Sequence, residues 1–325
     1  MSPGPEPPPQ RDGDRVEIAG PLYHGIPCRV RIAGDDAAAR AAWQALASVD
    51  AVFNVWRPDS ELGRINAAPP GRHHVSAWLA ACLRLAGEVE AASGGAWSAA
   101  MLPLVRRWRL AAAEGAAPDD AELVRLAATA ACGWSLDGQV LTIHRPDVAL
   151  DLGGIAKGFA VDRAVEELRA RDVADLLVQA GGESACLGAA DASGRRHRLA
   201  IPHPDQPDDA YCAVLQDPGS GLCGSTSGDY RLAFAVADGR HHHLLDPRSG
   251  RPTGSGAASA TWIFPGLGRN ALADGLSGAL AVLGADGLPR LHHHAGGEAC
   301  LLRRDAAEGL RCTRTAGWAA CEADA

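Results

Sequence analysis

The stretch from Asp151 to Asp162 combines a carboxylate, two adjacent glycines and a lysine, in the order Asp-Leu-Gly-Gly-Ile-Ala-Lys-Gly-Phe-Ala-Val-Asp. The apolar residues before it indicate the end of a buried strand, and the residues after Lys157 recur at helical spacing. We therefore expect a turn from a strand into a helix. Gly153 and Gly154 permit close backbone approach and positive φ, while the N–H groups at the helix start and the charge of Lys157 favour a bound phosphate. Asp151 fits beside that phosphate if it binds a ribityl or ribose hydroxyl, or acts through a metal ion.

This segment on its own has a second interpretation, a glycine-rich turn with a solvated lysine, which is frequent in α/β and α+β domains. Neither a Walker loop nor a Gly-x-Gly-x-x-Gly after a predicted strand occurs in the chain, which disfavours the common nucleotide-binding folds. Other segments must therefore distinguish the two interpretations.

The hydrophobic pattern along the chain predicts an α+β protein in which strand hairpins alternate with helices, rather than a doubly wound parallel sheet. Helices are expected at residues 36–52, 78–92, 119–131 and 271–283, in addition to the one that follows Lys157. Strands are expected at residues 28–32, 133–136, 140–144, 175–179, 197–202, 213–216, 231–237, 258–264 and 299–303.

The 325 residues are 47% hydrophobic, which is enough to bury a large core, and they carry a formal net charge of −8. An acidic chain of this kind argues against nucleic-acid binding over a broad basic surface. Residues 1–19 are expected to form a disordered tail, because five of the first nine are proline, and residues 20–325 are expected to form a single domain.

No apolar run in the sequence is long enough to span a membrane, and the chain as given has no apolar export signal and no lipidation cysteine. These features predict a cytoplasmic protein, or a periplasmic one if a leader was removed. The nine cysteines are odd in number and form no Cys-x-x-Cys pair. They predict small buried apolar side chains rather than a disulfide framework or a zinc site.

Six segments in series resemble the FAD:protein FMN transferase family, also called ApbE-like, from about residue 24 to the C-terminus. They are Phe53–Asn66, Asp151–Asp162, Gln179–Glu183, Ser225–Tyr230, His242–Pro252 and Ala273–Gly284. The resemblance implies an α+β fold with mixed, largely antiparallel sheets, flanking helices and a T-fold-like core. It also implies FAD as the substrate, Mg²⁺ as the cofactor and an acceptor flavoprotein as the partner, whose Ser or Thr hydroxyl takes FMN from FAD while AMP leaves.

The resemblance assigns the Mg²⁺ ion to the backbone carbonyl of Gly154, the carboxylate of Asp274 and the turn that contains Ser277 and Gly278. Hard oxygen donors of this kind suit Mg²⁺. The family has a threonine where this chain has Gly278, so one hydroxyl ligand is missing. Ser277 points about 100° away on an ideal helix, which leaves water to fill the position. Asp274 has a second interpretation as a carboxylate favoured near the start of a helix.

His243 is the expected catalytic base, because an ordinary histidine pKa of about 6.5 suits proton transfer at neutral pH. The histidine runs 241–243 and 292–294 could instead suggest a metal site, but adjacent residues on a strand point to opposite faces and rarely converge on one ion. Asp246 would either orient His243 or cap the turn that follows it.

Several segments of the resembled family contact the flavin and the adenine. Trp56 stands in place of a family tyrosine, and its indole can stack on a flat ring. Ala96, Trp97 and Ser98 stand where the family has Ala-Phe-Asp, so the aromatic ring is kept and the carboxylate is lost. The other expected FAD-binding residues are His24 in place of a methionine, Asp151, Lys157, Ser227 and Asp229.

Two other functions remain open at this point. One is a non-catalytic FAD-binding protein, and the other is a FAD pyrophosphatase that uses water as the acceptor and yields FMN and AMP. The side chains lost at Ser98 and Gly278 favour these alternatives, whereas Lys157, His243 and Asp274 favour FMN transfer.

Overall fold

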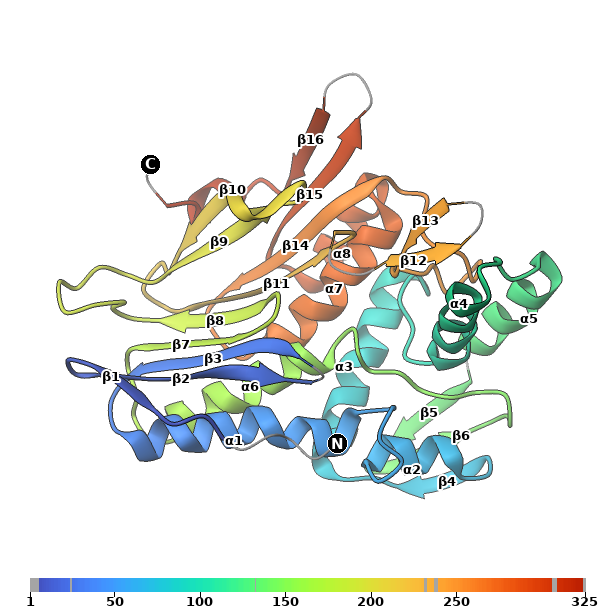
Figure 1. Ribbon diagram of the computed structural model, residues 1–325, viewed down its shortest axis with the longest axis horizontal. Coiled ribbons are helices and arrows are strands. Elements are labelled where there is room, and N and C mark those ends of the chain that lie inside the picture. The colour runs from blue at the N-terminus through green and yellow to red at the C-terminus, as the bar shows by residue number, and fades with distance from the viewer. Residues whose placement is uncertain are drawn as a thin grey trace.

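The computed structural model describes residues 6–23, 25–131, 133–230, 233–236, 239–305 and 309–323. A nine-stranded antiparallel sheet runs through the centre of the molecule, in the order β1-β2-β3-β7-β8-β11-β14-β15-β16 (Figure 1). Its strands are β1 (Gln10–Asp12), β2 (Arg15–Leu22), β3 (Ile26–Ala33), β7 (Leu176–Ala180), β8 (Glu183–Leu187), β11 (Leu222–Gly228), β14 (Ala257–Pro265), β15 (Glu298–Asp305) and β16 (Gly309–Arg314).

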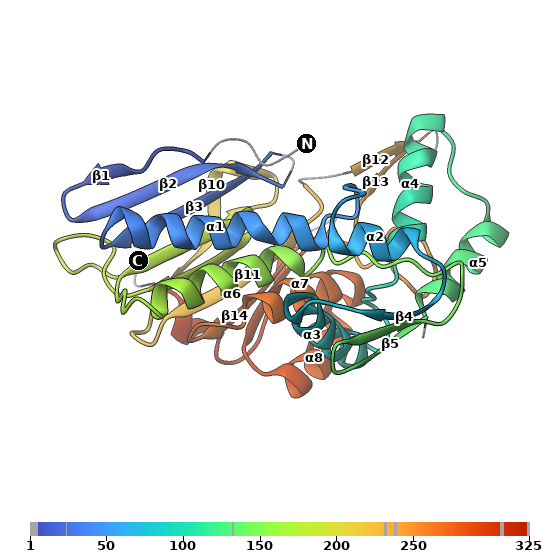
Figure 2. The same cartoon turned by 90° about the horizontal axis from the view of Figure 1, so that it is seen from below.

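Helices cover one face of this sheet, as the two views in Figures 1 and 2 show. The first layer contains α1 (Asp36–Phe53), α6 (Ala156–Arg169) and α7 (Asn270–Leu283), and α3 (Ala77–Ser93) and α8 (Leu288–Ala295) pack outside α7. The apolar alternation of the strands explains the layering. Trp262 and Phe264 of β14 face the helices and are buried in the main core, whereas Ile263 between them faces the other side.

The β9–β10 hairpin covers part of the opposite face. It consists of β9 (Arg198–His203) and β10 (Gln206–Gln216), which pair in antiparallel fashion with a bulge near Tyr211. Its apolar side chains form a second core with Trp318 of the short 3₁₀ helix η2 (Trp318–Cys321) and with Ile263. The sheet is therefore buried on both faces over its central strands.

A peripheral group of elements extends from one end of the helical layer (Figure 1). It contains α2 (Glu61–Ala67), the small sheet of β4 (Gly71–His74), β6 (Val140–Ile143) and β5 (Trp134–Asp137), helices α4 (Leu102–Glu114) and α5 (Asp120–Ala130), and the hairpin of β12 (Ala233–Val236) and β13 (Gly239–His242). A third apolar cluster holds α4 and α5 together through Leu104, Trp108 and Leu123, and Leu245 joins it from the segment after β13. The 3₁₀ turn η1 (Ala285–Gly287) links α7 to α8.

The α+β fold with antiparallel sheets and flanking helices is confirmed. Two expectations about local structure were wrong. Residues 10–19 are not a disordered tail, because β1 and most of β2 add to the edge of the main sheet through pairing with β3. The residues before Asp151 are not the end of a strand, since residues 148–152 have an irregular backbone.

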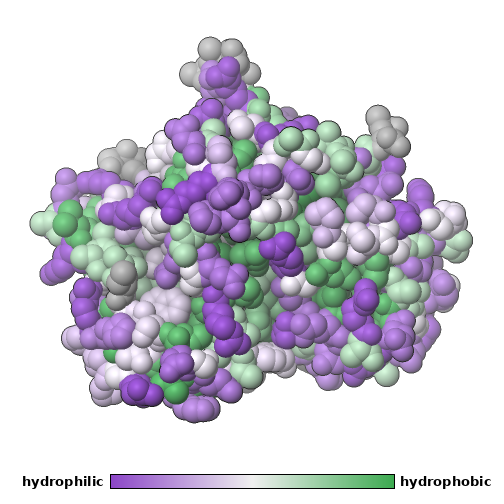
Figure 3. Space-filling model, turned by 180° about the vertical axis from the view of Figure 1, so that it is seen from behind, coloured by the Kyte–Doolittle hydropathy of each residue, from purple (hydrophilic) through white to green (hydrophobic). Residues whose placement is uncertain are grey.

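Within the described residues, no helix is both long enough and apolar enough to cross a membrane. On the face shown in Figure 3, hydrophobic patches are interrupted by hydrophilic side chains. Most of the described cysteines are buried, as expected, but Cys212 is half-buried and Cys312 is exposed.

Candidate active site

The segment from Leu150 to Gly154 is held in place by side chains from outside it. The amide of Asn66 accepts a hydrogen bond from the Leu150 N–H and donates one to the Leu150 carbonyl, both at 2.8 Å. The Asp151 N–H then donates to the carbonyl of Ala99 at 2.7 Å. Asn66, the last residue of the first resembling segment, therefore fixes the path of the glycine turn.

Gly153 and Gly154 are both exposed, and neither has a positive φ, contrary to expectation. Crowding explains the need for glycine instead. A Cβ on Gly153 would lie 3.0 Å from a carboxylate oxygen of Asp151, and a Cβ on Gly154 would lie 3.1 Å from Nε1 of Trp97. The turn therefore presents bare backbone next to an indole ring.

A buried cluster of charges lies directly behind this turn. Lys157, in the first turn of α6, places its Nζ 3.5 Å from Asp274 Oδ2 of α7 and 3.6 Å from Glu183 Oε1 of β8. The Asp274 carboxylate also accepts the N–H of Gly158 at 3.1 Å. A Cβ on Gly158 would lie only 2.3 Å from the carbonyl oxygen of Asn270, so glycine at this position lets α6 and α7 approach closely enough for these contacts. Lys157 is the only lysine in the 325 residues.

Three serine hydroxyls link the Glu183 carboxylate to the backbone of Asp274. Ser225 of β11 lies directly opposite Glu183 in the sheet and donates to Glu183 Oε1 at 3.1 Å. Ser277 of α7 lies 3.3 Å from the Ser225 hydroxyl and 2.8 Å from that of Ser227, and donates to the Asp274 carbonyl at 2.9 Å. Ser227 and Ser277, expected at FAD and at the ion respectively, are therefore in direct contact.

The electrostatics of the cluster follow from burial and from its single cation. Burial raises the pKa of Glu183 well above its usual value, and the nearby Asp274 adds to this, while Lys157 opposes it. For Lys157, burial alone would lower the pKa, but Asp274 and Glu183 together raise it, so the lysine stays charged. Glu183 Oε2 has no hydrogen-bond partner among the described residues, which leaves one buried carboxylate oxygen available to a ligand.

Trp97 forms one wall beside the cluster. The position of a Cβ on Gly278 is 3.5 Å from Cδ1 of Trp97 and 4.0 Å from the Ser227 hydroxyl, so Gly154, Gly278 and Ser227 meet around this ring. Gly278 is the one residue between Asn270 and Val282 that is not buried. Gly278 therefore leaves room for at least a Cβ beside Trp97.

Ser98 is turned away from this wall. It is buried, donates to the carbonyl of Ala130 at 2.8 Å and accepts the N–H of Ala100 at 3.1 Å. Glu90 of α3 accepts the neighbouring N–H of Ala99 at 2.8 Å, and Ala96 is buried. These residues shape the loop that carries Trp97.

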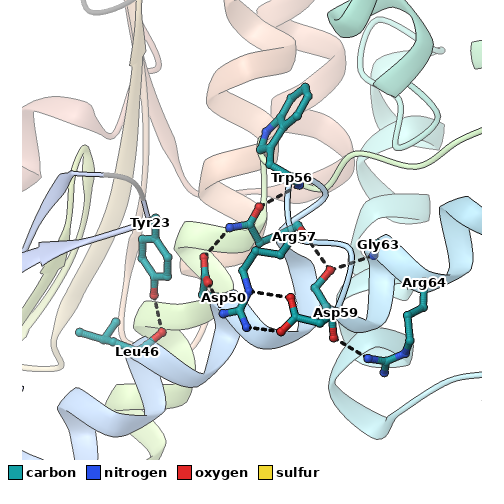
Figure 4. Close-up of polar contacts among 10 residues, drawn as sticks. Tyr23, Leu46, Asp50, Trp56, Arg57, Asp59, Gly63 and Arg64 are labelled. Atoms are coloured by element: carbon teal, nitrogen blue, oxygen red, sulfur yellow. Dashed lines mark hydrogen bonds and ion pairs between the residues drawn. The ribbon is translucent and has the colours of Figure 1, made fainter. Parts of the chain in front are cut away.

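Trp56 lies on a rigid loop between α1 and α2 (Figure 4). Arg57 binds Asp50 at 2.9 Å and Asp59 at 2.7 Å, and Ser60 caps α2 by accepting the N–H of Gly63 at 2.8 Å. The Trp56 ring points away from this polar network and is 40% exposed. Such a ring is suited to stacking.

Sequence reasoning missed two arginines of α4 near the site. The guanidinium of Arg109 lies over the Trp56 ring, 3.9 Å from its centroid. Burial raises the pKa of Asp151, and this outweighs the lowering by the Gly153 N–H and by the charges of Arg109, Lys157 and Arg106. Both arginines are exposed, whereas Arg107 between them pairs with Glu114 and Glu122. Their spacing of three along an amphipathic helix would have been the only signal in the sequence.

The remaining expected residues are less closely joined to the cluster. Asp229, just after β11, pairs with Arg304 and is half-buried. His243 follows β13 and is half-buried, next to Leu244 of the main core. Asp246 caps its own turn and binds Arg248 at 2.8 Å, so the turn interpretation of this residue holds. His24 lies outside the described residues.

The donors of the charged cluster and of the turn at Gly154 fit a hard cation better than a soft one. Among the described residues, no three His, Cys, Asp or Glu side chains converge on a common point. Asp274, the orphan oxygen of Glu183, the hydroxyl of Ser277 and the exposed turn at Gly154 supply oxygen only. An ion held by so few protein groups needs water and substrate oxygens to complete its shell, which is the usual way in which Mg²⁺ binds.

Comparisons with known proteins agree with this arrangement. Residues 24–302 match the sequence profile of the ApbE family. A FAD:protein FMN transferase from Vibrio cholerae is 30% identical over 245 residues, which cover 74% of this chain and 72% of the relative. Another from Klebsiella pneumoniae is 30% identical over 259 residues, covering 77% and 78% of the two chains.

Solved structures show the same fold. The apo form of the Pseudomonas stutzeri flavinyl transferase ApbE matches with a TM-score of 0.79 and 26% identity, covering 97% of this chain and 97% of that one. The ApbE protein from Thermotoga maritima matches with a TM-score of 0.81 and 22% identity, covering 95% of this chain and 100% of that one.

Proposed function

Because the chain belongs to the ApbE family, we propose that it is a Mg²⁺-dependent FAD:protein FMN transferase. In the proposed reaction, a Ser or Thr hydroxyl of an acceptor flavoprotein attacks the phosphorus of FAD nearest the riboflavin. The bond from this phosphorus to the bridging oxygen breaks, AMP leaves, and FMN remains on the acceptor as a phosphoester.

One observation carries the proposal, the convergence of Lys157, Glu183 and Asp274 behind the exposed turn at Gly154. Two buried carboxylates sharing one lysine are costly to maintain for stability alone, because each charge has lost its hydration. Lys157 also donates to the carbonyl of Gly153 at 3.1 Å, which joins the cluster to the exposed turn beside Trp97, where a flat ring and a phosphate can approach together. This arrangement suits a substrate with both features, as FAD has.

The ion would be held by the Asp274 carboxylate, the Gly154 carbonyl and Ser277, with water in place of the hydroxyl that Gly278 lacks. Mg²⁺ bound there would neutralise charge that develops on the pyrophosphate. Glu183 adds a second carboxylate to this site, and Lys157 keeps the two carboxylates from repelling each other when no substrate is bound.

The other residues divide between ring binding and proton transfer. Trp56 and Trp97 offer ring faces to the isoalloxazine and the adenine, and Arg109 places a positive charge beside Trp56 for the phosphates. Ser227 and Asp229 line the same side of the site from the end of β11. His243 takes the proton of the acceptor hydroxyl, and its half-buried position after β13 leaves the ring within reach of solvent.

A FAD pyrophosphatase is the second candidate, and one observation favours it. Gly278 leaves room for one more atom next to Trp97, and a water there could serve as the acceptor in place of a protein hydroxyl. A non-catalytic FAD-binding protein would need the same ring contacts but no ion.

AMP release distinguishes the three functions. The protein is incubated with FAD and Mg²⁺, with and without the acceptor flavoprotein of the Vibrio cholerae relative made free of flavin. A transferase releases AMP only with the acceptor, a pyrophosphatase releases it in both cases, and a binding protein in neither. Asp274→Asn should abolish the release, and Asp286→Asn, an exposed carboxylate in η1, serves as the matched control.

A further inference from the structure

Two cysteines of neighbouring strands lie in contact at the edge of the main sheet, far along the chain from the proposed site. Cys300 of β15 and Cys312 of β16 place their Sγ atoms 3.4 Å apart. Cys300 is buried in the second core, whereas Cys312 is exposed to solvent. One sulfur is thus accessible to a small reagent, and the other lies directly behind it.

A cation lies on the exposed sulfur. Arg314, two residues further along β16 and therefore on the same face, donates from Nε to Cys312 Sγ at 3.0 Å. Its other end is fixed by Glu322, at 2.9 Å, and Glu322 in turn accepts the indole N–H of Trp318 at 3.0 Å. The guanidinium is therefore held against the sulfur rather than free to turn into solvent.

These contacts separate the acidities of the two thiols. The hydrogen bond with Cys300 lowers the pKa of Cys312 most, Arg314 lowers it further, and burial opposes both. The hydrogen bond with Cys312, followed by burial, raises the pKa of Cys300. Cys312 thus has the character of an attacking thiolate and Cys300 that of the thiol that resolves it.

We propose that Cys312 and Cys300 form a redox-active pair, in which Cys312 reacts with a hydroperoxide and Cys300 then closes a reversible disulfide. The Cys312 thiolate attacks one oxygen of hydrogen peroxide, the O–O bond breaks, and a sulfenic acid and hydroxide form. The Cys300 sulfur then displaces hydroxide from Cys312 and loses its proton. Two thiols lose two electrons and two protons in total, and hydrogen peroxide becomes two molecules of water.

The register of the strands makes this disulfide easy to reduce. Leu302, not Cys300, lies directly opposite Cys312, so the two cysteines are diagonal neighbours. Diagonal positions on adjacent strands are farther apart than an unstrained disulfide prefers. Among the described strands β16 is at the edge of the sheet and pairs with β15 alone, so it can shift to close the bond. A bond closed under strain is readily reduced, which suits a reversible switch better than a permanent brace.

Another cysteine provides the internal comparison. Cys212 of β10 is half-buried, close enough for the charge of Cys312 to affect it, and burial raises its pKa. Its thiol is therefore expected to react with peroxide more slowly than Cys312 does. No third His, Cys, Asp or Glu in the described residues joins the pair to form a metal site.

The test uses the full-length, fully reduced protein and limiting hydrogen peroxide at pH 7. Remaining thiols are alkylated, and the protein is analysed by intact mass and by peptide mapping. We expect two thiols to be lost together, with one cross-link between Cys300 and Cys312 that dithiothreitol reverses. In Cys312→Ser the cross-link should be absent, and in Cys212→Ser it should form as in the wild type.

A variant of Arg314 tests the role of the guanidinium more directly. Arg314→Ala should slow oxidation of Cys312 about tenfold at pH 6, where the thiolate fraction limits the rate, and much less at pH 9. Arg311→Ala, on the same strand but the opposite face, should leave the rate unchanged. The proposal is overturned if Cys312 reacts no faster than Cys212, if Cys312 pairs with Cys212 instead, or if Cys312 proceeds to sulfinic acid while Cys300 stays free.

Discussion

Replacing Lys157 by methionine removes the cation that lies between Asp274 and Glu183 while keeping an unbranched side chain that is one atom shorter. Its Nζ lies 3.5 Å from Asp274 and 3.6 Å from Glu183, whose side chains are only 4% and 3% exposed. Removing one partner from a buried ion pair costs about 3–5 kcal/mol. We expect the free energy of unfolding to fall by about 3 kcal/mol, near the lower end of this range. Asp274 keeps its hydrogen bond from the Gly158 N–H, and Glu183 keeps the one from the Ser225 hydroxyl.

The loss should depend on pH. The pKa of Glu183 is already raised in the folded protein, so its carboxyl group disfavours the folded state as pH rises from its unfolded value through the raised one. Without Lys157 this pKa rises further, because burial and Asp274 are no longer opposed. The variant should therefore lose less stability at pH 5, where Glu183 holds a proton, than at pH 8.

Urea unfolding at both pH values measures this. Arg171→Met is the matched control, because Arg171 follows the same helix and its ion pair with Glu167 is exposed on both sides. It should change stability by less than about 0.5 kcal/mol at either pH. The electrostatic reasoning fails if Lys157→Met costs no more than the control, or if its cost is the same at pH 5 and pH 8.

Three further changes test neighbouring parts of the site. Gly278→Thr has room for its Cβ, 3.5 Å from Trp97, and should lower the Mg²⁺ concentration needed for half-maximal FAD cleavage. Thermal melting without metal measures separately any gain in stability from replacing a helical glycine. His243→Ala should slow AMP release on the order of 10²-fold with little change in FAD affinity, whereas loss of affinity alone would make it a pocket residue. Asp162 is buried against the N–H groups of Asn270 and Ala271, and burial raises its pKa from 3.8 to about 6. The free energy of unfolding of the wild type should therefore fall as the pH rises from 3.8 to about 6. That slope should disappear in Asp162→Asn, and its persistence in urea titrations would assign it to another group.

Helices with a strong apolar period were predictable from sequence. The apolar residues of α1, α3 and α7 recur every three or four positions, and the observed ends of α1 and α3 differ from the expected ones by a single residue. The strands β7 and β14 are short apolar runs and were also predicted within a residue at each end. Local pattern sufficed wherever burial of one face decided the structure.

Strand β11 was missed because its residues are typical of turns. The run Gly-Ser-Thr-Ser-Gly has low strand propensity, yet it lies between β8 and β14 at the centre of the sheet. A Cβ on Gly224 would lie 2.6 Å from Ile263 of β14, so the small residue here allows the two neighbouring strands to pack closely. These residues form a strand because of their tertiary contacts, which local strand propensity does not describe.

The candidate site was only partly predictable for a similar reason. The resemblance pointed to Lys157, Asp274 and Ser277. It did not indicate that the pairing of β8 with β11 would bring Glu183 and Ser225 to them. Asp162, at the end of the stretch expected to bind phosphate, caps α7 from inside the core. A carboxylate on a helix gives no local sign that a second helix begins against it.

The most direct test of the proposed function is the mass of the acceptor flavoprotein after incubation with FAD, Mg²⁺ and this protein. We expect each modified acceptor to gain one FMN in phosphoester linkage, with AMP released in equal amount. The adduct should be absent with Asp274→Asn and present with Asp286→Asn. An acceptor of unchanged mass, with FMN free in solution or FAD intact, would contradict FMN transfer.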